Sequence, residues 1–181
     1  MKRLIFASIV GSMLALAMVG NANAQNTNDV TLESVKYLQA SLAISQAGML
    51  EKANLNYSAD AHSKAIKDFK RSFKSATDER WSPVADGYIA TFTKDGIKTA
   101  VAYNKKGNWD HTIRFYGDNE LNADVKSIVM KEHYASKISQ VEEIEMNDKT
   151  VFLVHLEGSN GRKLVRVCDG EMETLVSAAK N

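Results

Sequence analysis

The fold is decided by residues 87–116, which read GYIATFTKDGIKTAVAYNKKGNWDHTIRFY. Apolar and polar residues alternate in three segments of this stretch, and such alternation is typical of half-buried β-strands. The turn-forming sequences KDG and NKKG separate the segments. We therefore predict three strands joined by short turns, an antiparallel meander that a further strand near residues 77–83 would extend to four strands.

Helical patterns stand on either side of this meander. Before it, apolar residues at three- and four-residue steps predict a helix over residues 59–74, with Ser58 as its N-cap. After it, a second helix is predicted from Asn122 to about Ala135. Alternating segments then predict four more strands, near residues 138–146, 150–157, 163–167 and 172–176.

A helix followed by antiparallel strands thus occurs twice. We predict an α+β fold of two tandem helix-plus-antiparallel-β-sheet repeats, the first spanning about residues 58–117 and the second about 118–181. Each repeat alone is too small to bury a core well, so the two are expected to pack together as one domain over residues 58–181.

The first 24 residues have the layout of a secretory signal peptide. Lys2 and Arg3 precede an apolar stretch that ends near Gly20, and residues 22–24, Ala-Asn-Ala, suit signal peptidase. A transmembrane anchor is disfavoured, because Ser and Gly residues interrupt this short apolar run. We expect cleavage after Ala24 and a periplasmic or secreted protein without a stable membrane anchor.

The segment between the signal peptide and the domain, residues 25–57, is harder to interpret. Its apolar residues follow helical spacing from Leu32 to Ala53, which predicts an amphipathic helix. Such a helix could dock on the domain or on a partner.

Composition and charge exclude several classes of protein. With 44% hydrophobic and 25% charged residues, the chain of 181 residues is ordinary for a folded globular protein. Its single cysteine, Cys168, excludes an intramolecular disulfide framework and is expected to be a buried thiol. Loss of Lys2 and Arg3 changes the formal net charge from +1 to −1. A near-neutral chain lacks the basic surface that nucleic acids require.

Three features together resemble a known family. They are Trp81 after the first predicted helix, the sequence GYIATF at residues 87–92, and VAYNKKG at residues 101–107. The chain resembles the PepSY-like family of exported bacterial proteins, also described as beta-lactamase-inhibitor-like. The resemblance implies tandem helix-plus-sheet repeats and a small periplasmic or secreted binding protein, with inhibition as one form of binding. It implies no cofactor and supplies no catalytic residues.

No catalytic, metal-binding or cofactor-binding residue is predicted. The four histidines are scattered singly along the chain, and His111 is expected to be a hydrogen-bonded histidine at the edge of the core. Glu142, Glu143 and Glu145 could be paired carboxylates for acid–base chemistry, but a solvated sheet edge is favoured. Motifs of serine nucleophiles and phosphate-binding loops are absent from the sequence.

The remaining candidate for a functional surface is one face of the predicted sheet. If alternation is continuous, the residues beneath the helices are Tyr88, Phe92, Val101, Tyr103, Trp109, Ile113 and Phe115. The opposite, open face would then carry the candidate partner-binding residues Thr91, Lys98, Thr112, Arg114 and Tyr116. Polar, aromatic and Arg side chains on a rigid sheet suit protein binding, although a plain solvated face is the alternative.

The sequence therefore favours an exported, non-catalytic binding module, a protein or hydrolase inhibitor among other forms, that acts on an unidentified envelope or extracellular protein. Two alternatives remain open. One is a small-ligand carrier, which would need an enclosed apolar cavity. The other is a small envelope enzyme with a shallow pocket between the repeats.

Overall fold

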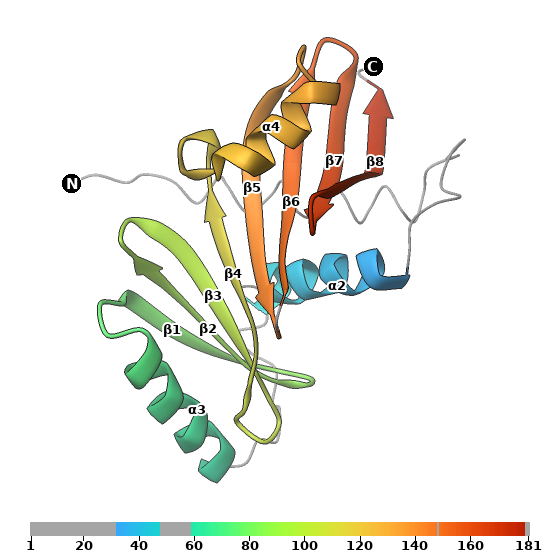
Figure 1. Cartoon of the computed structure of the whole chain (residues 1–181). Coiled ribbons are helices and arrows are strands. Elements are labelled where there is room, and N and C mark those ends of the chain that lie inside the picture. Colours follow the sequence, from blue (N-terminus) through green and yellow to red (C-terminus); the bar gives the residue numbers. More distant parts are fainter. Residues whose placement is uncertain (1–31, 48–58, 148, 180–181) are drawn as a thin grey trace, which may run out of the picture.

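The computed structural model describes residues 32–47, 59–147 and 149–179 of the chain. Its eight strands form a single antiparallel sheet in which each strand pairs with the next one in sequence (Figure 1). The strands are β1 (Thr77–Val84), β2 (Gly87–Lys94), β3 (Ile97–Asn104), β4 (Trp109–Tyr116), β5 (Lys137–Met146), β6 (Lys149–Gly158), β7 (Gly161–Cys168) and β8 (Glu171–Ala179). The helices are α2 (Leu32–Ala47), α3 (Ala59–Ser72) and α4 (Ala123–Glu132), and a short 3-10 helix, η1 (Asp118–Glu120), precedes α4.

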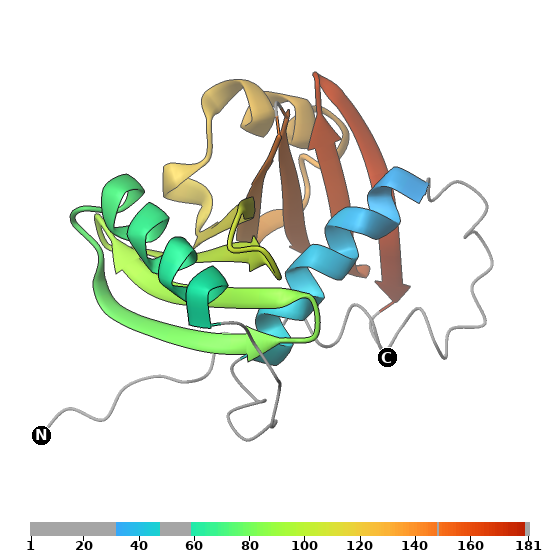
Figure 2. The same ribbon diagram turned by 90° about the horizontal axis from the view of Figure 1, so that it is seen from below.

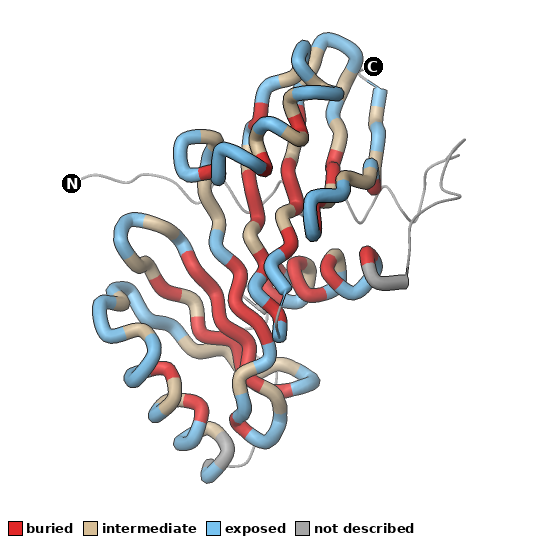
Figure 3. Tube along the Cα trace, viewed as in Figure 1, coloured by how far each residue is buried: buried red, intermediate tan, exposed pale blue. Residues whose placement is uncertain are grey.

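Helices lie on both faces of the sheet. Figures 1 and 2 show α3 and α4 on one face, over the first and the last strands respectively, and α2 crossing the opposite face. We call these the α3/α4 face and the α2 face. Runs of consecutive buried residues along the central strands (Figure 3) show that the sheet is covered from both sides, because successive side chains of a strand point to opposite faces. Only one covered face was expected.

The contact between α3 and the sheet is aromatic. Phe69 of α3 is buried and meets the ring of Phe92 edge-on at a centroid distance of 4.9 Å and that of Trp81 at 5.6 Å. Trp81 in turn stacks on Tyr103 at 5.7 Å. Helical spacing in α3 therefore puts its apolar side on the sheet, as predicted, and its lysines on the outside.

The contact between α4 and the sheet is aliphatic. Val125 and Val129 of α4 are buried against valines of β5, β6 and β7. Asn122 caps the helix, because its side-chain oxygen accepts a hydrogen bond of 2.8 Å from the backbone N–H of Asp124. The α3 and α4 clusters contain no described residue of α2.

A β-bulge in β4 reverses the direction in which its side chains point. Ala102 pairs with His111, but the next residue of β3, Tyr103, pairs with Trp109, so Asp110 is an extra residue. Trp109 therefore lies on the α3/α4 face, whereas Ile113 and the partly buried Phe115 pack on the α2 face. The prediction that all three lie together beneath the helices is wrong for Ile113 and Phe115.

The predicted elements otherwise agree with the structure. All eight strands and both flanking helices occur within a few residues of their predicted bounds. The helix predicted from Leu32 to Ala53 is α2, which the structure describes to Ala47. The signal peptide and the Ser58 cap lie outside the described residues. None of the helices in the described ranges is both long and apolar enough to cross a membrane.

A helix and four strands follow one another twice, as α3 with β1–β4 and α4 with β5–β8. Pairing of β4 with β5 joins the two halves into one continuous sheet. That the halves are copies of one repeat stays a prediction.

Candidate functional site

The five predicted binding residues do not share a face. Thr91 pairs with Ala100 and Lys98 with Phe115, which places both on the α2 face. The remaining three, Thr112, Arg114 and Tyr116, alternate along β4 after the bulge and lie on the α3/α4 face. The prediction of a single open face is therefore wrong, because the sequence pattern does not reveal the extra residue Asp110. Their role in binding stays a prediction.

Arg114 and Tyr116 are held by one carboxylate. Glu143, opposite Arg114 on β5, accepts a hydrogen bond from the Arg114 guanidinium through Oε1 and one from the Tyr116 hydroxyl through Oε2. The Arg114 side chain is 48% exposed, whereas that of Glu143 is largely buried. We call Thr112, Arg114, Tyr116 and Glu143 the β4/β5 strip. Figure 1 shows β4 running between α3 and α4. Within the strip, Arg114 is exposed, Tyr116 is partly buried against the cluster beneath α4, and Thr112 is buried.

The carboxylate of Glu143 also raises the pKa values of Arg114 and Tyr116. Burial, followed by the hydrogen bond and charge of Glu143, raises the pKa of Tyr116 well above its ordinary value of 10.0. Burial acts to lower the pKa of Arg114, but the hydrogen bond and charge of Glu143 outweigh it and raise that pKa. Arg114 is therefore charged and Tyr116 neutral at physiological pH.

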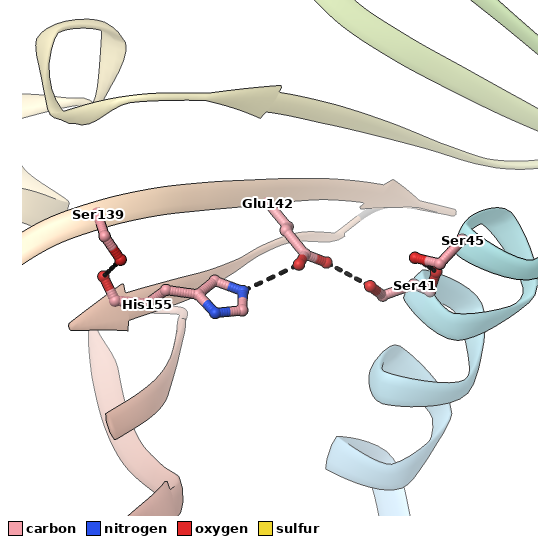
Figure 4. Close-up of polar contacts among 5 residues, drawn as sticks. All are labelled: Ser41, Ser45, Ser139, Glu142 and His155. Atoms are coloured by element: carbon pink, nitrogen blue, oxygen red, sulfur yellow. Dashed lines mark hydrogen bonds and ion pairs between the residues drawn. The ribbon is translucent and has the colours of Figure 1, made fainter. Parts of the chain in front are cut away.

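A second polar cluster lies on the α2 face. Glu142, next to Glu143 in sequence but on the opposite face, is only 1% exposed. Its Oε2 accepts a hydrogen bond from the Ser41 hydroxyl of α2, and its Oε1 lies 2.9 Å from Nε2 of His155 (Figure 4). Ser45 donates to the backbone carbonyl of Ser41 at 3.1 Å. The expectation of a solvated edge is wrong for Glu142, because β5 is a central strand and α2 covers it.

A similar contact holds the other end of α2. The Ser34 hydroxyl donates to Oε2 of Glu173 on β8 at 2.6 Å, and Nε of Arg166 donates to the same oxygen at 2.9 Å. The two carboxylates are thus each shared between α2 and a nitrogen-bearing side chain of the sheet. Such sharing satisfies charges that would otherwise be costly to bury.

The sequence does not predict these contacts between serines of α2 and carboxylates of the sheet. Ser34, Ser41 and Ser45 are spaced by seven and four positions, which places them on one side of a helix. The spacing is visible in the sequence, but it predicts only a small-residue stripe. The carboxylates that meet it come from strands more than a hundred residues away.

Serine, glutamate and histidine together invite comparison with a hydrolase triad. In such a triad the imidazole lies between the hydroxyl and the carboxylate and removes the proton from the hydroxyl. Here the carboxylate of Glu142 lies in the middle, between Ser41 and His155. Ser41 is also buried, so its hydroxyl is not open to a substrate while α2 is docked. The arrangement suits attachment of a helix.

His111 and Cys168, which the sequence also singles out, are both buried. His111 is buried, with Nδ1 2.8 Å from Oδ2 of Asp110, which confirms the predicted histidine at the edge of the core. Cys168 is buried as predicted, and burial together with Asp169 raises the pKa of its thiol. Among residues 32–47, 59–147 and 149–179, no group of three or more His, Cys, Asp or Glu side chains could hold a metal ion.

Comparison with known proteins agrees with this architecture. No protein-family model matches the chain, and no curated protein matches its sequence. A BLIP-like protein from Bacteroides fragilis is similar in structure, with a TM-score of 0.55 and 19% identity over 71% of this chain and 94% of that one. A DUF2874 family protein from Bacteroides uniformis gives a TM-score of 0.54 and 14% identity, over 66% of this chain and 91% of its own.

A candidate periplasmic protein from Bacteroides eggerthii is similar as well, with a TM-score of 0.53 and 15% identity over 66% of this chain and 90% of that one. At these identities the likeness concerns the fold. The predicted resemblance to beta-lactamase-inhibitor-like proteins is thus confirmed for the architecture, while the PepSY-like label stays a prediction. The chain has the α+β fold of the BLIP-like proteins, with helices packed on an eight-stranded antiparallel sheet.

Proposed function

We propose that the chain is an exported, non-catalytic module that binds another protein through the β4/β5 strip. The observation that carries the proposal is the fixed arrangement of Arg114 and Tyr116 on the carboxylate of Glu143. Arg and Tyr are among the residue types that contribute most at protein interfaces. Side chains that are already held in place lose little conformational entropy when a partner binds.

The position of the strip supports the same proposal. It lies on strands, which hold side chains more rigidly than loops do, and α3 and α4 flank it. Thr112 is buried and lies beneath this surface, where its hydroxyl accepts a hydrogen bond of 3.0 Å from the indole N–H of Trp109. Thr91 and Lys98, on the opposite face, are not part of this surface.

The proposed location is the periplasm or the extracellular space. It rests on the signal-peptide layout of residues 1–24 and on the likeness to a candidate periplasmic protein from Bacteroides eggerthii. The partner is accordingly an envelope or extracellular protein, and inhibition of a hydrolase is one form that the binding could take. The fold of a BLIP-like protein is compatible with such a role without establishing it.

The test is affinity capture with the mature chain, residues 25–181, immobilised and exposed to an envelope extract of the producing cell. We expect one saturable protein partner, whose retention decreases in Arg114→Ala and Tyr116→Ala. Lys98→Ala is the matched control, since Lys98 is an exposed cation on the opposite face. A column that retains no protein would overturn the proposal and favour a small-ligand carrier or a weak enzyme.

A further inference from the structure

The outer side of α3 carries a run of cations. Ala65 and Phe69 pack the inner side of this helix on the sheet, and the parts of its turns that point away from the sheet are exposed (Figure 3). The exposed side chains that the structure describes in α3 are all polar, namely Asp60, Ser63, Lys64, Lys67, Lys70, Arg71 and Ser72. Together with the exposed Lys74, two residues beyond the helix, the cations form what we call the α3 basic face: Lys64, Lys67, Lys70, Arg71 and Lys74.

The turn between β3 and β4 extends this face at one end. Lys64 donates a hydrogen bond to the side chain of Asn108, which follows that turn. The turn presents Lys105 and Lys106, both of which are exposed. Cations therefore extend from the turn along the 14 residues of α3, a length of about 21 Å at about 1.5 Å per residue.

The acidic side chains near this face are few and are mostly engaged elsewhere. Asp68 forms an ion pair with Arg71 and also accepts a hydrogen bond of 3.2 Å from the Tyr103 hydroxyl. Asp60 lies in the first turn of α3, where the helix dipole stabilises a negative charge. Glu79, at the start of β1, accepts a hydrogen bond from the indole of Trp81.

Three cations of the face are left without a counter-charge. In the part of the chain that the structure describes, no ion pair involves Lys67, Lys70 or Lys74. Lys67 also has Lys70 and Arg71 three and four positions further along the helix. Like charges at this spacing repel each other and destabilise a helix.

The fold does not require a helix of this kind, as α4 shows. α4 lies on the same face of the sheet in the second half of the domain, and its charges balance, with two acids and two bases: Asp124, Lys126, Lys131 and Glu132. Nζ of Lys126 lies 2.8 Å from Oδ2 of Asp118. Mixed charges therefore suffice to solvate a helix in this position. The excess of cations on α3 indicates a negatively charged binding partner.

The residue types favour a lipid surface over a protein as that partner. Interfaces between proteins are enriched in aromatic residues and Arg and are depleted in Lys. The α3 basic face has four lysines and one arginine, while the apolar side of the helix is used by the sheet. Anionic headgroups of a bilayer attract each nearby cation without any need for shape complementarity.

We propose that the α3 basic face holds the protein against an anionic phospholipid bilayer, with headgroup phosphates as the ligands of its lysines. The association is peripheral and is reversed by salt, because it rests on exposed charges. It goes beyond the proposed function and does not depend on it, since binding to vesicles is measured in the absence of a partner protein.

The experiment is co-sedimentation of the mature chain, residues 25–181, with phosphatidylcholine vesicles that contain or lack phosphatidylglycerol. We expect binding to the anionic vesicles that is about tenfold or more stronger than binding to the neutral ones. The binding should decrease between about 0.01 M and about 0.15 M salt, because the Debye length falls from about 30 Å to about 8 Å.

A triple variant tests whether the α3 basic face is responsible. Lys67→Gln, Lys70→Gln and Lys74→Gln combined remove three charges and retain good helix-forming residues, so binding to anionic vesicles should weaken about tenfold or more. The matched control combines Lys98→Gln, Lys131→Gln and Lys137→Gln, which changes the net charge equally at exposed positions outside α3. The control should bind as the wild type does, and both variants should keep the circular dichroism spectrum of the folded protein.

Three outcomes would overturn the proposal. Equal binding to neutral and anionic vesicles, or no binding to either, would mean that the face does not recognise anionic lipid. Equal weakening in the two triple variants would mean that only the net charge matters. Unchanged vesicle binding by the α3 variant, together with loss of a captured envelope protein, would assign the basic face to an acidic protein.

Discussion

Replacing Glu142 by alanine removes the carboxylate that joins α2 to the sheet. Glu142 accepts a hydrogen bond from Ser41, and His155 Nε2 lies 2.9 Å from its other oxygen. A hydrogen bond to a charged group contributes about 1.5–3 kcal/mol, so two such bonds amount to about 3–6 kcal/mol. Part of this is offset, because alanine carries no charge whose burial is costly. We expect Glu142→Ala to lower the free energy of unfolding by about 2–4 kcal/mol.

The assay is urea unfolding followed by far-ultraviolet circular dichroism. Glu145→Ala is the matched control, because Glu145 is exposed on the same strand and its loss should change the free energy of unfolding by less than about 0.5 kcal/mol. Glu142→Gln keeps an acceptor for Ser41 but not the charge, so its effect should lie between those of the two alanine variants. Equal midpoints for Glu142→Ala and Glu145→Ala would refute the reasoning that the buried carboxylate anchors α2.

Three further predictions concern the other face. Phe69→Ala empties the aromatic contact of α3 with the sheet and should cost about 3–5 kcal/mol in urea unfolding, whereas an effect below about 1 kcal/mol would contradict that contact. Asn122→Ala removes the N-cap of α4 and should cost about 1 kcal/mol in the same assay, and no loss would mean that the cap is dispensable. The folded-state pKa of Tyr116 is raised, so the stability that it contributes is complete below its ordinary pKa of 10.0 and is lost as pH rises through the folded value. Absorbance titration near 295 nm should therefore show two phenols that ionise late, because burial and Asp68 also raise the pKa of Tyr103. Glu143→Gln should bring only one of them closer to pH 10, and an unchanged titration would exclude Glu143 as a cause.

The strands could be predicted from sequence because each contains its own alternating pattern and ends at a turn. Asp95-Gly96 and Asp169-Gly170 occupy such turns, and all four residues have positive φ there. α3 could be predicted because Ala65 and Phe69 repeat at helical spacing. Local patterns of this kind need no knowledge of the partner element.

The direction of the β4 side chains could not be predicted in the same way. Trp109, His111, Ile113 and Phe115 alternate without a break in the sequence, yet the extra residue Asp110 puts the first of them on one face and the others on the opposite face. A bulge cannot be recognised from the order of apolar and polar residues in a sequence. The predicted binding face was divided for this reason.

The coverage of the sheet on both faces, in contrast, is visible in the sequence. Residues 88–90, Tyr-Ile-Ala, and residues 100–103, Ala-Val-Ala-Tyr, are continuous apolar runs, and all of them are buried. Continuous runs are typical of strands that are covered on two sides, whereas strict alternation is typical of one covered side. The burial of Glu142 could not be predicted from the residues around it, because it depends on a helix that comes from a distant part of the sequence.

The central claim is that the β4/β5 strip binds a partner protein. The most direct measurement is the dissociation constant of the captured partner, determined by calorimetry for the mature chain and for Arg114→Ala, Tyr116→Ala and Lys98→Ala. Loss of a central interface residue costs about 2 kcal/mol or more, so each of the first two variants should bind at least tenfold more weakly while keeping the far-ultraviolet circular dichroism spectrum of the folded protein. Lys98→Ala should bind as the wild type does. Equal affinities for all four proteins would contradict the claim.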